Sequence, residues 1–246
     1  MSVVETPSNA QLVARRAASL YGSPLGSAEG VLHVTAVART DDGLRVMRIG
    51  PAPRSPTDFF ALSLTRARVD AVVVTGGVLR AEPELRYDLA PSLRTWRGAD
   101  GPLLLVMTRG ANLPSQHPVW ESEAQPLVLT GARAAAELRR ALPSRVEVVG
   151  VEAPSGRAAL DYLQRERGCR SVSIEAGPSV AVPLYDAPNR IDEVVLSVYE
   201  GALPDVARGG AYIEESRLHA EFERVGGPTR VDEPSGPWVF SRWLRR

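Results

Sequence analysis

The sequence predicts an α/β protein with a largely parallel central sheet that helices cover on both faces. Short continuous apolar runs at residues 70–75 and 103–107 are typical of strands buried on both faces. Segments with helix-capping signals alternate with these runs, which favours parallel over antiparallel pairing. The length of 246 residues suffices for one domain with a sizeable core.

The elements follow in order from the N-terminus. Residues 1–30 are predicted to form a leader that packs outside one domain of residues 31–246, with a short helix at residues 9–20. Residues 31–38 indicate a strand. Ser55 can cap the next helix, Pro56 fits its first position, and Asp58 favours its positive end.

The remaining elements are predicted from the same signals. Further strands are expected at residues 70–75, 103–107, 126–129, 146–149, 170–174 and 191–198. Further helices are expected at residues 132–142 and from Ser155 to Arg167, where Gly168 ends the second one. Residues 221–225 and 238–243 suggest a closing antiparallel pair, whose Trp238, Phe240 and Trp243 suit either the core or an interface.

Composition excludes several classes of function. All 29 basic residues are Arg, so Schiff-base chemistry and the lysine of a phosphate-binding P-loop are absent. Twenty-nine acidic residues balance them, and this argues against a nucleic-acid or membrane-surface binder. The single Cys169 predicts a cytoplasmic protein, and with three scattered His it gives no metal-ligand spacing.

Three strand ends are the candidate ligand-binding positions, because ligands of such sheets bind beyond the carboxyl ends of the strands. These ends are Thr75-Gly76-Gly77, Thr108-Arg109 and Glu175–Ser179. Gly177 would let a ligand approach the backbone, and Arg109 could pair with a phosphate. Plain alternatives stay open, since glycine turns also serve packing and a surface Arg is often only solvated. The sequence contains no G-x-G-x-x-G, G-x-S-x-G or H-E-x-x-H motif.

Taken in order, these motifs resemble the pyrimidine reductase family of riboflavin biosynthesis. Val34–Gly43 (VTAVARTDDG) resembles a first strand that ends in Ser-x-Asp-Gly, and Val74–Pro83 (VTGGVLRAEP) resembles the family's cofactor loop. Leu105–Arg109 (LVMTR) resembles the strand whose end receives the 2′-phosphate of NADPH. Val172–Ser179 (VSIEAGPS) resembles the most specific motif, Glu-Gly/Ala-Gly-Pro-Thr. The family occurs fused to a deaminase or as a stand-alone chain.

The resemblance implies a three-layer dihydrofolate reductase-like fold and an NADPH-dependent oxidoreductase. In the family, hydride transfer reduces the ribosyl group of a 5-amino-6-(5-phosphoribosylamino)uracil-like substrate. By analogy Asp42 and Glu175 would be catalytic, and Arg54, Arg80 and Glu82 would bind the substrate. The residues expected to bind NADPH are Thr75, Gly76, Gly77, Val78, Thr108, Arg109, Ala176, Gly177, Pro178 and Ser179. A homodimer is also expected by resemblance alone.

The sequence departs from the family pattern mainly on the substrate side. Many members carry a Lys in the first strand, where this chain has Thr35–Val37, and Ala81 stands in the loop where fused members have Asp. Three alternatives therefore remain: a reductase of another pterin, folate or carbonyl substrate, a non-catalytic nucleotide-binding homologue, and an unrelated α/β enzyme. Pro183 is expected to shorten or kink the helix after Gly177.

Overall fold

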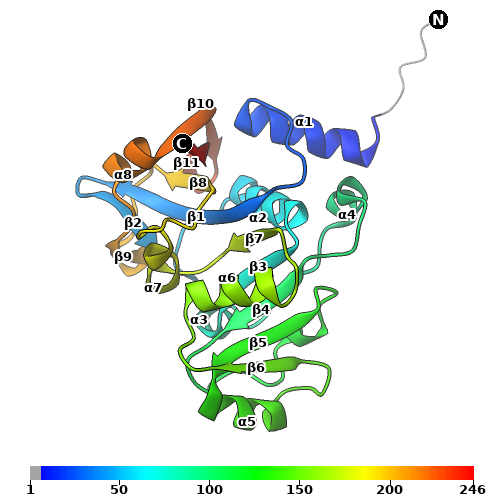
Figure 1. The fold of residues 1–246 in the computed structure, drawn as a ribbon. Coiled ribbons are helices and arrows are strands. Elements are labelled where there is room, and N and C mark those ends of the chain that lie inside the picture. The colour runs from blue at the N-terminus through cyan, green and yellow to red at the C-terminus, as the bar shows by residue number, and fades with distance from the viewer. Residues whose placement is uncertain (1–6) are drawn as a thin grey trace, which may run out of the picture.

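A computed structural model describes residues 7–246, whose strands form a single mixed sheet (Figure 1). Its six central parallel strands are β1 (Gly30–Thr40), β7 (Ser171–Ile174), β3 (Ala71–Thr75), β4 (Leu103–Met107), β5 (Pro126–Gly131) and β6 (Glu147–Val151). They lie side by side in that order. Each predicted strand of this region is confirmed, and its ends shift by two residues or fewer.

The C-terminal strands close the other side of the sheet. β8 (Glu193–Tyr199) pairs parallel with β1, while β11 (Gly236–Arg245) pairs antiparallel with β8 and with β10 (Phe222–Glu233). The predicted closing pair is thus confirmed, although β10 is much longer than residues 221–225. A mostly parallel sheet with an antiparallel C-terminal hairpin confirms the predicted fold class.

Two strands were not predicted. β2 (Gly43–Met47) follows the turn after β1 and pairs back onto it, and β9 (Arg208–Ala211) pairs with β2. Both strands are short, and most of their residues are not buried. They lack the apolar runs by which strands are recognised in a sequence.

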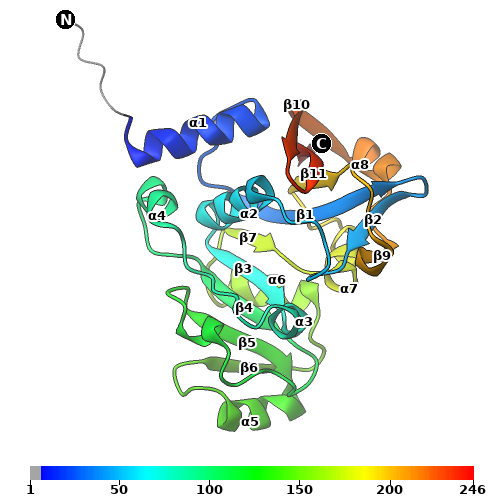
Figure 2. The same cartoon turned by 180° about the vertical axis from the view of Figure 1, so that it is seen from behind.

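Helices cover both faces of the sheet, which gives three layers (Figures 1 and 2). One apolar cluster packs the sheet against α6 (Gly156–Arg165), α7 (Pro178–Ala181) and α8 (Glu215–Glu221). On the opposite face lie α1 (Asn9–Tyr21), α2 (Pro56–Arg68), α3 (Gly76–Ala81), α4 (Pro91–Arg97) and α5 (Ala132–Ala141). Three single-turn 3₁₀ helices cover Pro118–Glu121, Val182–Leu184 and Asp205–Ala207.

The helix starts follow the predicted capping chemistry. Ser55 accepts a hydrogen bond from the Asp58 N–H at 2.8 Å, and Pro56 occupies the first turn of α2. Ser155 caps α6 in the same way. After Gly177, α7 is only four residues long and gives way to a 3₁₀ turn at Pro183, which confirms the expected shortening.

One local prediction was wrong. Thr75-Gly76-Gly77 is not a glycine turn, because Gly76 and Gly77 are the first two residues of helix α3. β3 therefore passes into a helix without a loop. Single-sequence patterns do not reveal a helix that begins with two glycines, since glycine is a poor helix former.

The terminal regions pack onto the core. α1 buries Val13, Ala17, Leu20 and Tyr21 in the cluster that also holds Trp238 and Phe240 of β11. These aromatics thus serve the core within one chain. The division into a leader and one domain stays a prediction. None of the described helices is long and apolar enough to cross a membrane.

Candidate active site

The sheet has an opening between β1 and β7. β1 pairs with β7 only as far as His33, and its pairing with β2 begins at Val37. Residues 34–36 of β1 therefore have no strand partner on that side, and we call them the open edge. Thr35 and Ala36 are partly exposed although their strand is otherwise largely buried. β7 ends beside this opening, so residues 175–179 leave the sheet there.

The three predicted strand ends meet at one cavity, which we call the inner cavity. It has a volume of about 350 Å³ and lies where β3, β4 and α7 converge. The residues that line it are Thr75, Gly76, Gly77, Arg80, Met107, Thr108, Arg109, Gly110, Asn112, Ser179 and Val180. Six of the ten residues expected to bind the cofactor are among them. The other four, Val78, Ala176, Gly177 and Pro178, are adjacent in sequence to lining residues or to each other.

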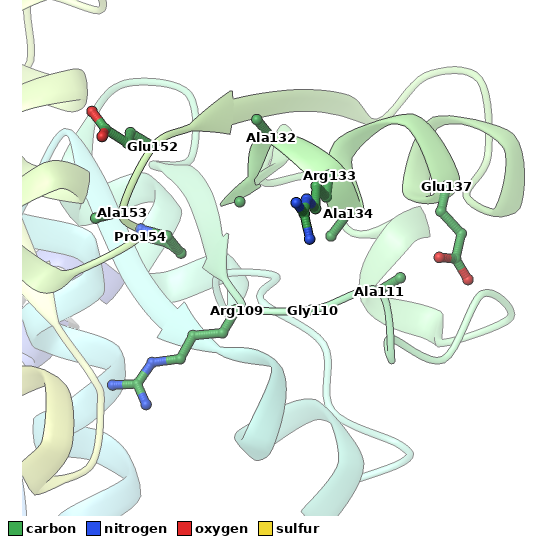
Figure 3. A pocket seen from close by; sticks show the side chains of 11 residues that line it. Arg109, Gly110, Ala111, Ala132, Arg133, Ala134, Glu137, Glu152, Ala153 and Pro154 are labelled. Carbon is green, nitrogen blue, oxygen red and sulfur yellow. The ribbon is translucent and has the colours of Figure 1, made fainter.

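A second, larger cavity of about 840 Å³ continues along the same edge of the sheet, and we call it the outer cavity. It shares Arg109 and Gly110 with the inner cavity and extends to the start of α5 and the end of β6 (Figure 3). Arg133 comes from the first turn of α5, whose capping residue Gly131 offers no side-chain acceptor to the free N–H groups. Arg133 was not predicted from the sequence, because it belongs to no recognisable motif.

Glycine stands at two positions of the site for different physical reasons. A Cβ on Gly76 would stand 2.5 Å from Leu113 Cδ2, so packing within the chain explains that glycine. Gly177 has an ordinary φ of −65°. An added Cβ there would meet nothing within 4 Å, so neither the backbone nor the packing of the chain requires glycine at this position. The space beside Gly177 fits the close approach of a ligand.

Glu175 is held by a buried arginine of α2. Arg66 Nη2 donates to Glu175 Oε2 at 2.7 Å and Arg66 Nε donates to Oε1 at 3.0 Å, with both side chains 6% exposed. The guanidinium also stacks 4.1 Å above the Tyr87 ring. Burial lowers the pKa of Arg66, but Glu175 and Tyr87 outweigh this, and the net direction is upward. The buried guanidinium thus holds the Glu175 carboxylate in one position beside the open edge.

Arg66 and Tyr87 were not predicted from the sequence. Both resemble ordinary helix and loop residues, and only the fold brings them to the end of β7. The sequence holds part of the signal for Arg66, because a buried arginine on the sheet-facing side of a helix needs an acidic partner.

The expected substrate residues are dispersed. Asp42 lies at the exposed turn after β1, where it pairs with Arg45 at 3.1 Å. Arg54 is an exposed residue in the loop before α2, and it lines neither cavity described above. Arg80 lines the inner cavity and donates to the Asn112 carbonyl at 2.7 Å. Glu82 follows α3 and is close enough to Arg66 and Tyr87 to influence the pKa of both side chains.

On the face of β1 that points away from α2, His33 forms a neutral polar network with two tyrosines beside the open edge. His33 Nδ1 is 2.7 Å from the Tyr185 hydroxyl and His33 Nε2 is 2.6 Å from the Tyr212 hydroxyl. Burial lowers the pKa of His33 to about 3, so the ring is uncharged at neutral pH. A neutral imidazole donates one of these bonds and accepts the other.

Comparisons with known proteins fit this architecture. The family model of the RibD C-terminal domain matches residues 45–203. A pyrimidine reductase-like protein from Corynebacterium diphtheriae superposes with a TM-score of 0.65 at 19% identity, covering 98% of this chain and 99% of its own. The structure of Acinetobacter baumannii RibD superposes with a TM-score of 0.63 at 18% identity. The match covers 89% of this chain and 58% of that chain.

The Saccharomyces cerevisiae riboflavin biosynthesis reductase Rib7 gives a TM-score of 0.55 at 13% identity, with 95% of this chain and 99% of that chain covered. No curated protein sequence matches. At these identities the solved structures support the fold alone, whereas the family model covers well over half of the chain. The chain therefore belongs to the RibD C-terminal domain family, the pyrimidine reductases of riboflavin biosynthesis, and is an oxidoreductase by family.

Proposed function

We propose that this protein is an NADPH-dependent reductase that transfers hydride to a 5-amino-6-(5-phosphoribosylamino)uracil-like substrate. The observation that carries the proposal is that the inner and outer cavities lie side by side and share Arg109 and Gly110 in their linings. Two adjoining cavities suit an elongated dinucleotide. A reductase of this family implies a nicotinamide cofactor, which supplies the hydride while the protein positions the acceptor.

The charges of the outer cavity support NADPH over NADH. Arg109 and Arg133 line it, and a guanidinium binds phosphate through paired N–H donors. Glu137 and Glu152 also line it and lie toward opposite ends of the close-up view (Figure 3). We place the extra phosphate of NADPH near Arg109 and the start of α5, and the nicotinamide near Gly177 and the open edge.

On the substrate side, Glu175 is the proposed contact for hydroxyl or N–H groups of the acceptor. Arg66 fixes the position of the Glu175 carboxylate, so it can accept further hydrogen bonds without reorganising. Asp42, Arg54 and Glu82 remain proposed contacts by resemblance.

A second candidate is a reductase of the same class that acts on a pterin, a folate or another carbonyl compound. The observation that favours it is the position of Asp42 and Arg54. Asp42 is already paired with Arg45, and neither residue lines the two cavities. The residues expected to bind the substrate therefore support a phosphoribosyl substrate less strongly than the residues expected to bind the cofactor support NADPH.

Steady-state oxidation of NADPH tests both candidates. We expect turnover with the phosphoribosylamino-pyrimidine and little with pterins, folates or simple carbonyl compounds. The reverse pattern would favour the second candidate, and no oxidation with any acceptor would contradict the reductase assignment.

Cofactor preference tests the phosphate position. Arg109→Ala should weaken NADPH binding by about 10- to 100-fold, the scale of one lost charge-assisted hydrogen bond, and leave NADH binding nearly unchanged. Arg140→Ala is the matched control, because Arg140 is exposed like Arg109 but lines neither cavity. Equal losses for NADPH and NADH would contradict this placement.

A further inference from the structure

The side of α2 that faces the open edge carries a second carboxyl group. Asp58, Leu62 and Arg66 follow at intervals of four residues, so they share one stripe of the helix. The bond from Arg66 to Glu175 fixes one end of this stripe beside the end of β7. Asp58 forms the other end, one turn beyond Leu62, at the start of the helix.

The sheet fixes where Asp58 lies relative to β1. Ser197 of β8 lies close enough to the Asp58 carboxyl to lower its pKa. Ser197 is the direct partner of Ala36 in the pairing of β1 with β8. Ala36 belongs to the open edge, and Ala36 and Leu62 pack against the same apolar cluster. The Asp58 carboxyl is therefore next to the open edge on the α2 face.

The surroundings of Asp58 raise the pKa of its carboxyl group. Burial raises this pKa, Ser197 lowers it, and the nearby Glu233 of β10 raises it, with a net upward direction. Glu233 accepts a hydrogen bond from the Thr57 N–H at 3.0 Å, and Tyr21 of α1 lies close enough to be influenced by Asp58. No cation is among the groups that shift the pKa of Asp58.

We propose that Asp58 is a catalytic residue that contacts the acceptor and gives it a proton during reduction. This inference rests on the proposed function. The acceptor carbon of a C=N or C=O bond takes the hydride that the reduced nicotinamide supplies. The π electron pair of that bond moves to the nitrogen or oxygen, which takes the proton from Asp58, and the Asp58 carboxylate regains a proton from water.

Asp58→Asn tests this role, because the amide keeps the size of the side chain but carries no transferable proton. We expect kcat to fall by at least about 100-fold, while the Kd for NADPH stays within about threefold of the wild type. Thermal unfolding of the same variant verifies that it is folded. A kcat within about threefold of the wild type would overturn the inference.

Ser197→Ala gives a second readout that a merely structural role of Asp58 would not produce. Ser197 is a positioning residue here, and loss of its hydroxyl should raise the pKa of Asp58. Activity that depends on protonated Asp58 then persists to higher pH, so the alkaline limb of kcat moves upward. Ser173→Ala is the matched control, because Ser173 is also a buried strand serine but its hydroxyl has no partner.

The outcomes separate this inference from the proposed function. Wild-type turnover with an unchanged Asp58→Asn variant, or identical alkaline limbs for Ser197→Ala and the wild type, would overturn the role of Asp58 alone. A wild-type protein that neither binds nor oxidises NADPH would overturn the proposed function and this inference with it.

Discussion

Two arginines of α2 make almost the same buried ion pair at opposite ends of β7 and β8, the two strands that flank β1. Arg66 reaches Glu175 at 2.7 Å, just after β7, and Arg68 reaches Glu193 at 2.6 Å, at the start of β8. Residues two positions apart on a helix point to different sides, so one helix holds both glutamates. Glu193 has a second partner in Arg242 at 2.8 Å, whereas Glu175 adjoins the open edge.

An ion pair becomes a candidate functional group through its place in the sheet. Two guanidinium groups enclose the Glu193 carboxylate within the core. Burial raises the pKa of Glu193, but Arg242 and Arg68 outweigh it and lower that pKa. The Glu175 carboxylate is bound by a guanidinium from one residue only, at the carboxyl edge where the two cavities lie.

Glu193→Gln should cause the largest loss of stability. It leaves Arg68 and Arg242 with an uncharged partner in the core, and loss of a buried partner costs about 3–5 kcal/mol of stability. Urea unfolding measures this loss. NADPH binding by the folded protein should stay unchanged, and a selective loss of NADPH binding would show that Glu193 acts in the site.

Glu175→Gln should cost less stability and more activity. Arg66 keeps its contact with the Tyr87 ring and one amide oxygen, so we expect a loss of about 2–3 kcal/mol. Turnover should fall by more than about 100-fold, because the fixed carboxylate beside the acceptor is lost. Stability from urea unfolding and kcat from NADPH oxidation give the two values. A Glu175→Gln variant that loses stability but retains full turnover would contradict a functional difference between the Arg66–Glu175 and Arg68–Glu193 pairs.

His33 is an uncharged buried group between these two ion pairs, because it pairs with Ile174 of β7 and Val194 of β8. Its folded pKa of about 3 lies below the unfolded value near 6.5. Its contribution to stability is therefore present above about pH 6.5 and is lost as the pH falls toward 3. The free energy of unfolding should drop by about 2 kcal/mol between pH 6.5 and pH 5.

Urea unfolding at each pH measures this slope, with His33→Gln as the test and His219→Gln as the control. His219 is exposed and should leave the slope unchanged. A wild-type slope that survives in His33→Gln would assign the pH dependence to other groups.

Much of the fold could be predicted from the sequence, because buried parallel strands and capped helices leave local patterns. β4 (Leu103–Met107) and the start of α2 are examples. β2, β9 and the helix that starts at Gly76 could not be predicted. The two strands depend on pairing with β1 and with each other, and the start of the helix depends on close packing around Gly76. At the site, motifs located the strand ends, but Arg66, Tyr87 and Asp58 acquire their surroundings only through contacts distant in sequence.

Thermal unfolding of Gly177→Val with and without NADPH tests whether the cofactor lies beside Gly177, where we place the nicotinamide. Open space beside Gly177 and its ordinary φ predict a variant whose stability without ligand is within about 1 kcal/mol of the wild type, a loss expected for Val at the N-cap of α7. NADPH at about 100 times its Kd should raise the Tm of the wild type by about 5–11 °C.

The same NADPH concentration should leave the Tm of Gly177→Val almost unchanged, because the valine side chain occupies the space proposed for the cofactor. An equal rise in Tm for the variant and the wild type would contradict the placement of the cofactor beside Gly177. No rise for the wild type would contradict the NADPH assignment itself.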